Sequence, residues 1–451
     1  MGDGATTTRY VRVGGCHIAY SHVGTAESDL CVILPTIGSI ELLGERPARD
    51  LVAGQAKFSR VISFDRRGSG ISDPVDDPAT LEEQMDDVTA VLDACGSTTT
   101  ALTAEAEGAM LAVLYAATHP ERVSHLILMH PIARLTRADD YDWTWPSAEV
   151  RDRELVAPLV ARWGSGENAA TIAPVLAAKD PEFMRWWGRW ERIGASPGAA
   201  EQRLRLIGEL DVREILPRVQ TPTLIVDRPA APAMDSRHAR YFAERIPGAK
   251  LAELPGRDAI SFGDGSDAYV EATQEFILGT TGRTDLESQR ALATVLFTDI
   301  VGSTTRAAEL GDRRWRETLE GHDRLTRKLV ARFGGRAIKS TGDGFLATFD
   351  GPARAVRCAS ALTTEVDEFG IEIRAGVHTG EVELIGADVG GMAVHIGARI
   401  GGLGGPGEVL ASSTVRDLVV GSGIEFDDRG EEELKGVPGS WRIFAVADAG
   451  E

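Results

Sequence analysis

Two stretches near the carboxyl end decide the fold of this part of the chain: FTDIVGST at residues 297–304 and KSTGDGFLATF at residues 339–349. Each combines an apolar strand with a glycine-containing turn, and each carries an aspartate where the strand ends, Asp299 in the first and Asp343 in the second. Two carboxylates side by side on adjacent strands repel each other unless divalent cations neutralise them. Because both ligands are hard oxygen donors, the pattern favours Mg²⁺ or Mn²⁺.

Further motifs follow downstream of this pair. They are RAGVHTGEVE (374–383), VHIGARI (394–400), GPGEVLAS (405–412) and LKGVPGSWRIF (434–444). With these motifs, residues 291–447 resemble the class III adenylate and guanylate cyclases. The resemblance implies an α+β domain with a ferredoxin-like βαββαβ core at 291–451 that converts ATP to 3′,5′-cyclic AMP and pyrophosphate.

The same resemblance implies a two-metal site. Asp299 and Asp343 match the metal-binding aspartates, with the carbonyl of Ile300 beside them. Two Mg²⁺ or Mn²⁺ ions per site would activate the ribose 3′-hydroxyl and stabilise the leaving pyrophosphate.

Four further positions match residues that handle the substrate in this family. Lys339 and Asp388 match the pair that recognises the adenine ring, since a lysine donates to N1 and an aspartate accepts from the exocyclic amine. Arg399 matches the arginine that stabilises the transition state. His395 stands where most of the family has asparagine to orient the ribose, which puts full activity and the pH dependence in question.

The family builds each site at a dimer interface, and this chain carries every residue type required. A head-to-tail homodimer is therefore the simplest assembly. Two alternatives stay open here: a guanylate cyclase, and a nucleotide-binding sensor with weak turnover because of His395.

Residues 1–280 show a different pattern, in which strand-like and helix-like segments alternate. This alternation predicts a mostly parallel sheet covered by helices, interrupted by a helical cap at about 136–215. The segment 281–290 is polar and lacks apolar periodicity, so we interpret it as a linker. Together with the motifs FDRRGSGISD at 64–73 and TPTLIVD at 221–227, this order resembles the α/β-hydrolase fold.

The resemblance also places the catalytic triad of that fold on alanines. The nucleophile elbow reads AEAEG, with Ala106 at its apex, and the acid and histidine positions fall on Ala231 and Ala259. Losing all three groups removes serine hydrolase chemistry, because each partner activates the next. A hydrolase with a carboxylate nucleophile, Glu105 or Glu107, remains an alternative, although residues adjacent to an elbow apex are expected to point elsewhere.

The expected cap is rich in tryptophan, which suits a pocket for a small apolar ligand. Six of the eight tryptophans fall there: Trp143, Trp145, Trp163, Trp186, Trp187 and Trp190. A silent hydrolase domain would then act as a regulatory or ligand-binding module. Packing of the cap helices explains the same tryptophans equally simply.

Composition limits the partners and the compartment. Sixty-eight acidic against 48 basic residues give a net charge of −20, which disfavours nucleic acid and anionic membrane surfaces. No signal peptide and no long apolar run are visible, and the four cysteines are scattered without a paired motif. A cytoplasmic protein with reduced thiols is the expectation.

Overall fold

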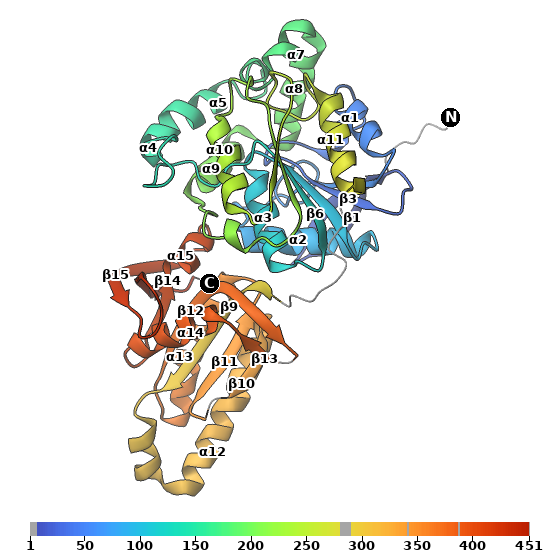
Figure 1. Cartoon of the computed structure of the whole chain (residues 1–451). Helices are drawn as coiled ribbons and strands as arrows, with labels where there is room; N and C mark the ends of the chain where they lie inside the picture. Colours follow the sequence, from blue (N-terminus) through green and yellow to red (C-terminus); the bar gives the residue numbers. More distant parts are fainter. Residues whose placement is uncertain (1–6, 280–289, 341, 387, 451) are drawn as a thin grey trace. The chain divides into compact units, whose positions relative to one another are not determined.

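The computed structural model describes residues 7–279, 290–340, 342–386 and 388–450 (Figure 1). The chain divides into two compact units, Met1–Leu286 and Glu287–Glu451. The interpretation of 281–290 as a linker falls outside the described residues, except for Arg290, which opens strand β9.

The N-terminal unit is built on an eight-stranded sheet in the order β1-β2-β4-β3-β5-β6-β7-β8. The pairings β1–β2 and β2–β4 are antiparallel and all the others are parallel. The strands are β1 (Arg9–Val13), β2 (Cys16–Val23), β3 (Asp29–Ile33), β4 (Arg60–Phe64), β5 (Thr100–Glu105), β6 (Val123–Met129), β7 (Thr223–Asp227) and β8 (Lys250–Glu253). The mostly parallel sheet predicted from the alternating pattern is confirmed.

Helices cover this sheet, and their ends follow from local sequence. The helices outside the cap are α1 (Ala48–Gln55), α2 (Leu81–Ala94), α3 (Gly108–Thr118), α10 (Ser236–Arg245) and α11 (Ser266–Gly279). α2 begins with a capping box in which Thr80 and Glu83 satisfy each other's backbone N–H groups. Every residue of α3 is buried, because this helix lies in the middle of the unit, directly after β5.

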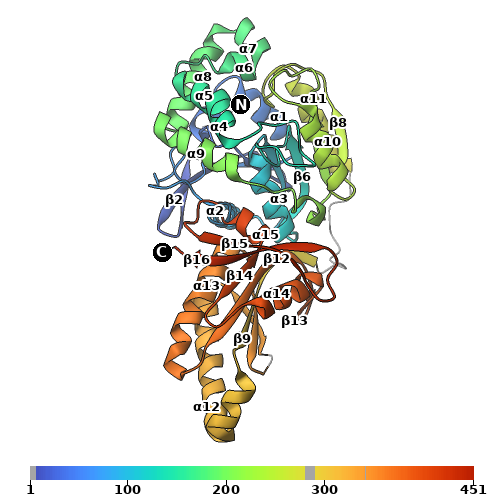
Figure 2. The same cartoon turned by 90° about the vertical axis from the view of Figure 1, so that its left-hand side faces the viewer.

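Six short helices lie between β6 and β7 and form the cap, drawn mostly in green at one end of the strands in Figures 1 and 2. They are α4 (Ala148–Arg151), α5 (Ala157–Ala161), α6 (Ala169–Ile172), α7 (Pro174–Lys179), α8 (Pro181–Gly194) and α9 (Pro197–Glu209). Proline in the first turn starts four of them, where its missing N–H is not needed.

The C-terminal unit contains a second sheet, in the order β10-β11-β9-β12-β14-β16-β15, with β13 paired to β12. Its strands are β9 (Arg290–Ile300), β10 (Arg336–Ser340), β11 (Gly344–Phe349), β12 (Ile373–Ile385), β13 (Asp388–Gly390), β14 (Val409–Ser412), β15 (Glu425–Glu433) and β16 (Ser440–Asp448). Its helices are α12 (Ser303–Arg332), α13 (Pro352–Glu365), α14 (Met392–Leu403) and α15 (Ser413–Leu418). The run β9-α12-β10-β11-α13-β12 is the expected ferredoxin-like βαββαβ core.

The two faces of this second sheet carry separate apolar cores. Alternate residues of β9 divide between them, with Leu296 packing towards α12 and α13 and Val295 packing with Ala393 of α14. α14 lies so close to β12 that a Cβ added at Gly376 would come within 2.2 Å of the Gly401 nitrogen. The glycines of β12 and α14 therefore fix the helix that carries His395 and Arg399.

In the described parts of the chain, no helix combines the length and the apolar character needed to cross a membrane.

Candidate active site and cap cavity

The ladder between β9 and β11 places Asp299 and Asp343 next to each other. Asp299 lies opposite Gly344, and the N–H of Ile300 donates to the carbonyl of Asp343 across 3.2 Å. Both aspartates are partly exposed. The two carboxylates that the sequence singled out are thus brought together at the ends of adjacent strands.

Neighbouring side chains hold each carboxylate by one oxygen. Arg374 lies opposite Asp299 on β12 and donates to Oδ2 from Nη2 (2.6 Å) and Nε (3.0 Å). The hydroxyl of Ser303, the first residue of α12, donates to Oδ2 of Asp343. Arg374 was not among the site residues predicted from the sequence, although it is the first residue of the motif RAGVHTGEVE.

This donor set fits a hard divalent cation that is only partly enclosed by protein. The Oδ1 atoms of Asp299 and Asp343 accept no hydrogen bond from the described residues. No group of three or more histidine, cysteine, aspartate or glutamate side chains suitable for a metal occurs among the described residues. A cation held by this pair would therefore keep positions for other oxygen ligands.

Lys339 and Asp388 form an exposed ion pair. The ammonium of Lys339 donates to both carboxylate oxygens, at 2.7 and 2.9 Å, and this hydrogen bonding lowers the pKa of Asp388. Lys339 lies opposite Leu346, on the face of the sheet that packs with α14. The two groups are close enough to contact one planar ring edge together.

His395 and Arg399 lie one turn apart on the exposed side of α14, as their spacing predicted. The Nε of Arg399 donates to the carbonyl of Lys435 at 3.1 Å. Within the described residues, no hydrogen bond or ion pair links either residue to Asp299 or Asp343. The helix thus presents one part of the predicted site to solvent.

A tight turn joins β5 to α3 at the place where the sequence predicts a nucleophile elbow with Ala106 at its apex. Ala106 has φ of 47°, one of two non-glycine residues with positive φ in the described chain. Its N–H donates to the carbonyl of Met129 at 3.0 Å, which holds the strained turn between β5 and α3. Ala231 and Ala259 are both buried and, like Ala106, offer no side-chain atom for acid–base or nucleophilic chemistry.

A cavity of about 610 Å³ lies between this elbow and the cap. Ala106 and Ala259 line it, whereas Ala231 does not. Five of the cap tryptophans contribute to its walls, namely Trp143, Trp145, Trp163, Trp187 and Trp190. Trp186 instead stacks on Trp190, with ring centroids 5.0 Å apart, and packs the cap.

Glu105 and Glu107 both line the cavity, contrary to the expectation that residues beside the apex point elsewhere. Glu105 accepts a hydrogen bond from the N–H of Ser261 (3.3 Å), and burial raises its pKa. Glu107 accepts one from the N–H of Thr36 (2.7 Å). Each carboxyl group is therefore already engaged by the backbone.

A buried imidazole–carboxylate pair lies outside the cavity wall. His130 Nδ1 is 3.2 Å from Asp227 Oδ1, and His130 is the second residue with φ of 47°. Asp227 ends β7, so the pair joins the carboxyl ends of two neighbouring strands. It contacts none of the three alanine positions by hydrogen bonding.

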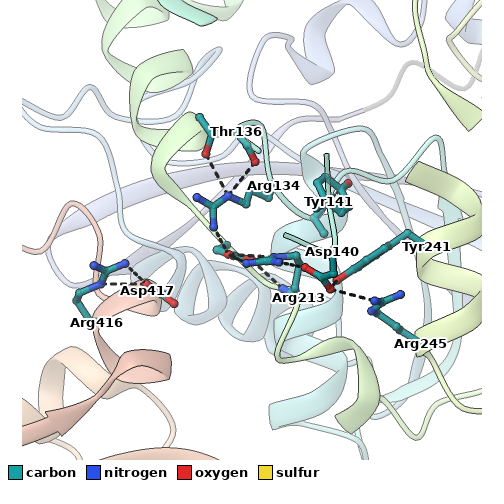
Figure 3. A network of polar contacts seen from close by, with 11 residues as sticks. Arg134, Thr136, Asp140, Tyr141, Arg213, Tyr241, Arg245, Arg416 and Asp417 are labelled. Carbon is teal, nitrogen blue, oxygen red and sulfur yellow. Dashed lines mark hydrogen bonds and ion pairs between the residues drawn. The ribbon is translucent and has the colours of Figure 1, made fainter. Parts of the chain in front are cut away.

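A polar network fastens the two ends of the cap to the sheet domain (Figure 3). Asp140 accepts from Arg213, from Tyr241 (2.6 Å) and from Arg245 (2.9 Å). Figure 3 also shows Arg134, which pairs with Asp211 at 2.8 Å. The network therefore connects the first and last residues of the cap with α10.

Comparisons with known families agree with this division. Residues 287–447 match the adenylate and guanylate cyclase catalytic domain, and residues 54–221 match the α/β hydrolase fold. The C-terminal unit is thus a class III cyclase catalytic domain, fused to a domain of the α/β-hydrolase fold.

Individual relatives support the same assignment. A putative adenylate cyclase of Rhizobium meliloti (strain 1021) is 33% identical over 166 residues, which are 33% of this chain and 27% of that protein. A pH-sensitive adenylate cyclase of Mycobacterium tuberculosis (strain CDC 1551 / Oshkosh) is 30% identical over 169 residues, 34% of this chain and 40% of that protein. The chain therefore spans less than half the length of these curated relatives.

A solved structure supports the fold of the other unit. The bromoperoxidase from Bacillus anthracis superimposes with a TM-score of 0.50 at 18% identity, over 60% of this chain and all of that one. At this identity the likeness concerns the fold alone.

Proposed function

We propose that this chain is an adenylate cyclase that forms 3′,5′-cyclic AMP and pyrophosphate from ATP. The observation that carries the proposal is the pair Asp299 and Asp343 at adjacent strand ends of a cyclase-family domain. These carboxylates, with the carbonyl of Ile300, would hold Mg²⁺ or Mn²⁺, which supplies positive charge at the triphosphate and at the 3′-hydroxyl. The 3′-oxygen would bond to the α-phosphorus, the bond from that phosphorus to pyrophosphate would break, and the hydroxyl proton would pass to water.

Lys339 and Asp388 would give the site a preference for adenine. The adenine edge presents an acceptor at N1 beside a donor amine, which matches one ammonium donor beside one carboxylate acceptor. Guanine presents a donor at N1 and an oxygen at position 6, so both contacts would be mismatched. The short distance between Lys339 and Asp388 lets one ring engage both groups.

Two copies of the chain would complete the site. Arg399 would stabilise the charge that develops on the α-phosphate, and His395 would hydrogen-bond the ribose. Because both lie on an exposed helix face without contact to Asp299 in the described chain, a second copy is the simplest source of the missing half.

The N-terminal unit would act as a pseudo-hydrolase that senses a ligand. Its support is the combination of three alanines at the triad positions with an intact elbow and a large cavity. A ligand bound there regulates the cyclase only by the difference in its affinity for two states of the chain.

Cyclic-nucleotide production by the purified chain with Mn²⁺ tests the main proposal, with ATP and GTP offered separately. We expect cyclic AMP from ATP, a loss of at least about 100-fold in Asp343→Ala, and normal activity in the exposed control Asp350→Ala. Product from GTP alone would make the chain a guanylate cyclase. No product from either nucleotide, with ATP still bound, would make it a nucleotide sensor.

A second candidate is a hydrolase with a carboxylate nucleophile. The presence of Glu105 and Glu107 in the cavity wall favours it. Hydrolysis of short-chain esters by the purified chain tests this candidate. It predicts that Glu105→Gln or Glu107→Gln abolishes the hydrolysis while the thermal unfolding midpoint stays unchanged.

A further inference from the structure

The walls of the cap cavity offer carbon surfaces to a ligand. The indole N–H groups of three lining tryptophans already donate hydrogen bonds to other groups of the protein. Trp163 donates to the carbonyl of Ala195 (2.9 Å), Trp187 to Glu191 (3.0 Å) and Trp190 to the carbonyl of Ile37 (2.7 Å). These rings therefore present their apolar faces, and about 610 Å³ is the size that a drug-like molecule fills.

The charges around the cavity disfavour an anion. Three acidic side chains, Glu105, Glu107 and Glu191, line its less exposed part, while Glu154 and Asp235 line it from exposed positions and are paired with arginines. Among the described lining residues, Arg137 is the single lysine or arginine, and it is exposed to solvent. A carboxylate entering this space would lose hydration and meet like charge.

A cation would compete with the protein for the inner carboxyl groups, because each of them already accepts at least one hydrogen bond. Glu191 accepts hydrogen bonds from the backbone of Gly164 (2.7 Å), from the Asn168 amide (2.8 Å) and from Trp187. Glu107 is bound by a backbone N–H, and the raised pKa of Glu105 reflects a disfavoured negative charge.

Several donors among the lining residues have no hydrogen-bond partner in the described chain: Trp143 Nε1 and Thr144 Oγ1 are two of them, and the ring of His238 offers a third. The hydroxyl of Tyr141 accepts from the N–H of Ala133 (3.3 Å), and Nδ1 of His238 is the one acceptor that the described residues offer to its proton, so we assign the phenol as donor to Nδ1. Burial lowers the pKa of His238 to about 4, so its ring is neutral at neutral pH and carries its proton on Nε2. Nε2 has no hydrogen-bond partner among the described residues, and His238 lines the cavity.

We propose that the cap cavity binds a neutral, predominantly apolar molecule with a hydrogen-bond-accepting oxygen that contacts His238, and that it excludes carboxylates of equal size. This inference rests on the proposed sensing role of the N-terminal unit and is independent of cyclase activity.

Three eight-carbon probes that differ in charge test the proposal on the full chain: octan-2-one, octanoate and octylammonium. Quenching of tryptophan fluorescence reports binding, and calorimetry gives the affinities. We expect octan-2-one to bind at least about tenfold more tightly than octanoate or octylammonium at neutral pH. The double variant Glu105→Gln/Glu107→Gln should recover at least about fivefold in octanoate affinity, whereas the exposed control Glu271→Gln should not.

Each other outcome overturns the proposal. Equal binding of octanoate and octan-2-one removes the argument from charge, and tightest binding of octylammonium makes the cavity a cation site. No binding of any probe shows that the cavity is not a receptor for such ligands. Cyclic AMP formation measured on the same sample separates these failures from failure of the proposed cyclase function.

Discussion

His395 is the residue of the C-terminal unit whose identity matters most for turnover. It is exposed on α14 one turn before Arg399 and hydrogen-bonds none of the described residues. A neutral imidazole offers one donor and one acceptor, whereas an asparagine amide offers two donors and an acceptor oxygen in a smaller volume.

We therefore expect His395→Asn to raise kcat by about threefold to tenfold, which corresponds to roughly 1 kcal/mol of better transition-state contact. Steady-state kinetics with ATP and Mn²⁺ measures the effect. A lower kcat in the variant would show that the imidazole is itself the better ribose contact.

His238 has a consequence for stability that can be measured without any ligand. Its pKa of about 4 in the folded chain lies below the value of about 6.5 in an unfolded chain, because burial disfavours the charged ring. As the pH falls through this window, the unfolded chain takes up a proton that the folded chain does not, so the folded state loses stability.

His238→Asn retains an acceptor for Tyr141 and removes this titration. We expect the decline in the free energy of unfolding between pH 6.5 and pH 4 to be smaller in the variant, by on the order of 2–3 kcal/mol. Chemical denaturation across this range gives the comparison. Parallel curves for the variant and the original chain would show that His238 does not titrate there.

Among the elements, α14 depends on glycine for its position against β12. A methyl group at Gly376 would overlap the backbone of Gly401, which cannot rotate away. Gly376→Ala should destabilise the C-terminal unit by about 2–4 kcal/mol and lower cyclase activity, because α14 carries Arg399. Gly402→Ala in the same helix meets nothing within 4 Å and is the matched control, which should be neutral or slightly stabilising.

The same helix would offer a surface to the proposed second copy. Met392 and Leu403 are 50% and 46% exposed and lie at the two ends of the exposed side that carries His395 and Arg399. Met392→Glu/Leu403→Glu should shift sedimentation from dimer to monomer and reduce cyclase activity, while thermal unfolding stays close to that of the original chain. Leu278→Glu, equally exposed but in the N-terminal unit, should leave the assembly unchanged.

The alternating pattern was sufficient for the N-terminal sheet, because buried apolar strands such as β6 carry a clear signal, but it did not reveal β15, whose acidic residues are mostly exposed. Helical spacing, which is local, placed His395 with Arg399, whereas Asp299 was expected beside Asp343 from the motifs that resemble the cyclase family. Sequence patterns did not reveal Arg374 on Asp299 or Tyr141 on His238. Those contacts join residues 75 and 97 positions apart and depend on tertiary packing.

At the scale of the whole molecule, ligand binding in the cap cavity and nucleotide binding at the cyclase site are either thermodynamically coupled or independent. If they are coupled, the coupling must be reciprocal. A cavity ligand that changes the affinity for nucleotide by some factor has its own affinity changed by the same factor when nucleotide is bound. Neither unit alone can reveal this property, because it belongs to the equilibrium between states of the full chain.

We expect octan-2-one to bind the full chain with an affinity that changes by at least about fivefold when a non-hydrolysable ATP analogue and Mn²⁺ are saturating. The affinity for the analogue should change by the same factor when octan-2-one is saturating, and calorimetry measures both. Lys339→Ala should weaken binding of the analogue. At analogue concentrations too low to occupy this variant, the affinity for octan-2-one should therefore stay at its nucleotide-free value. An unchanged affinity in the original chain would mean that the two units act independently, because a ligand with equal affinity for both states shifts neither.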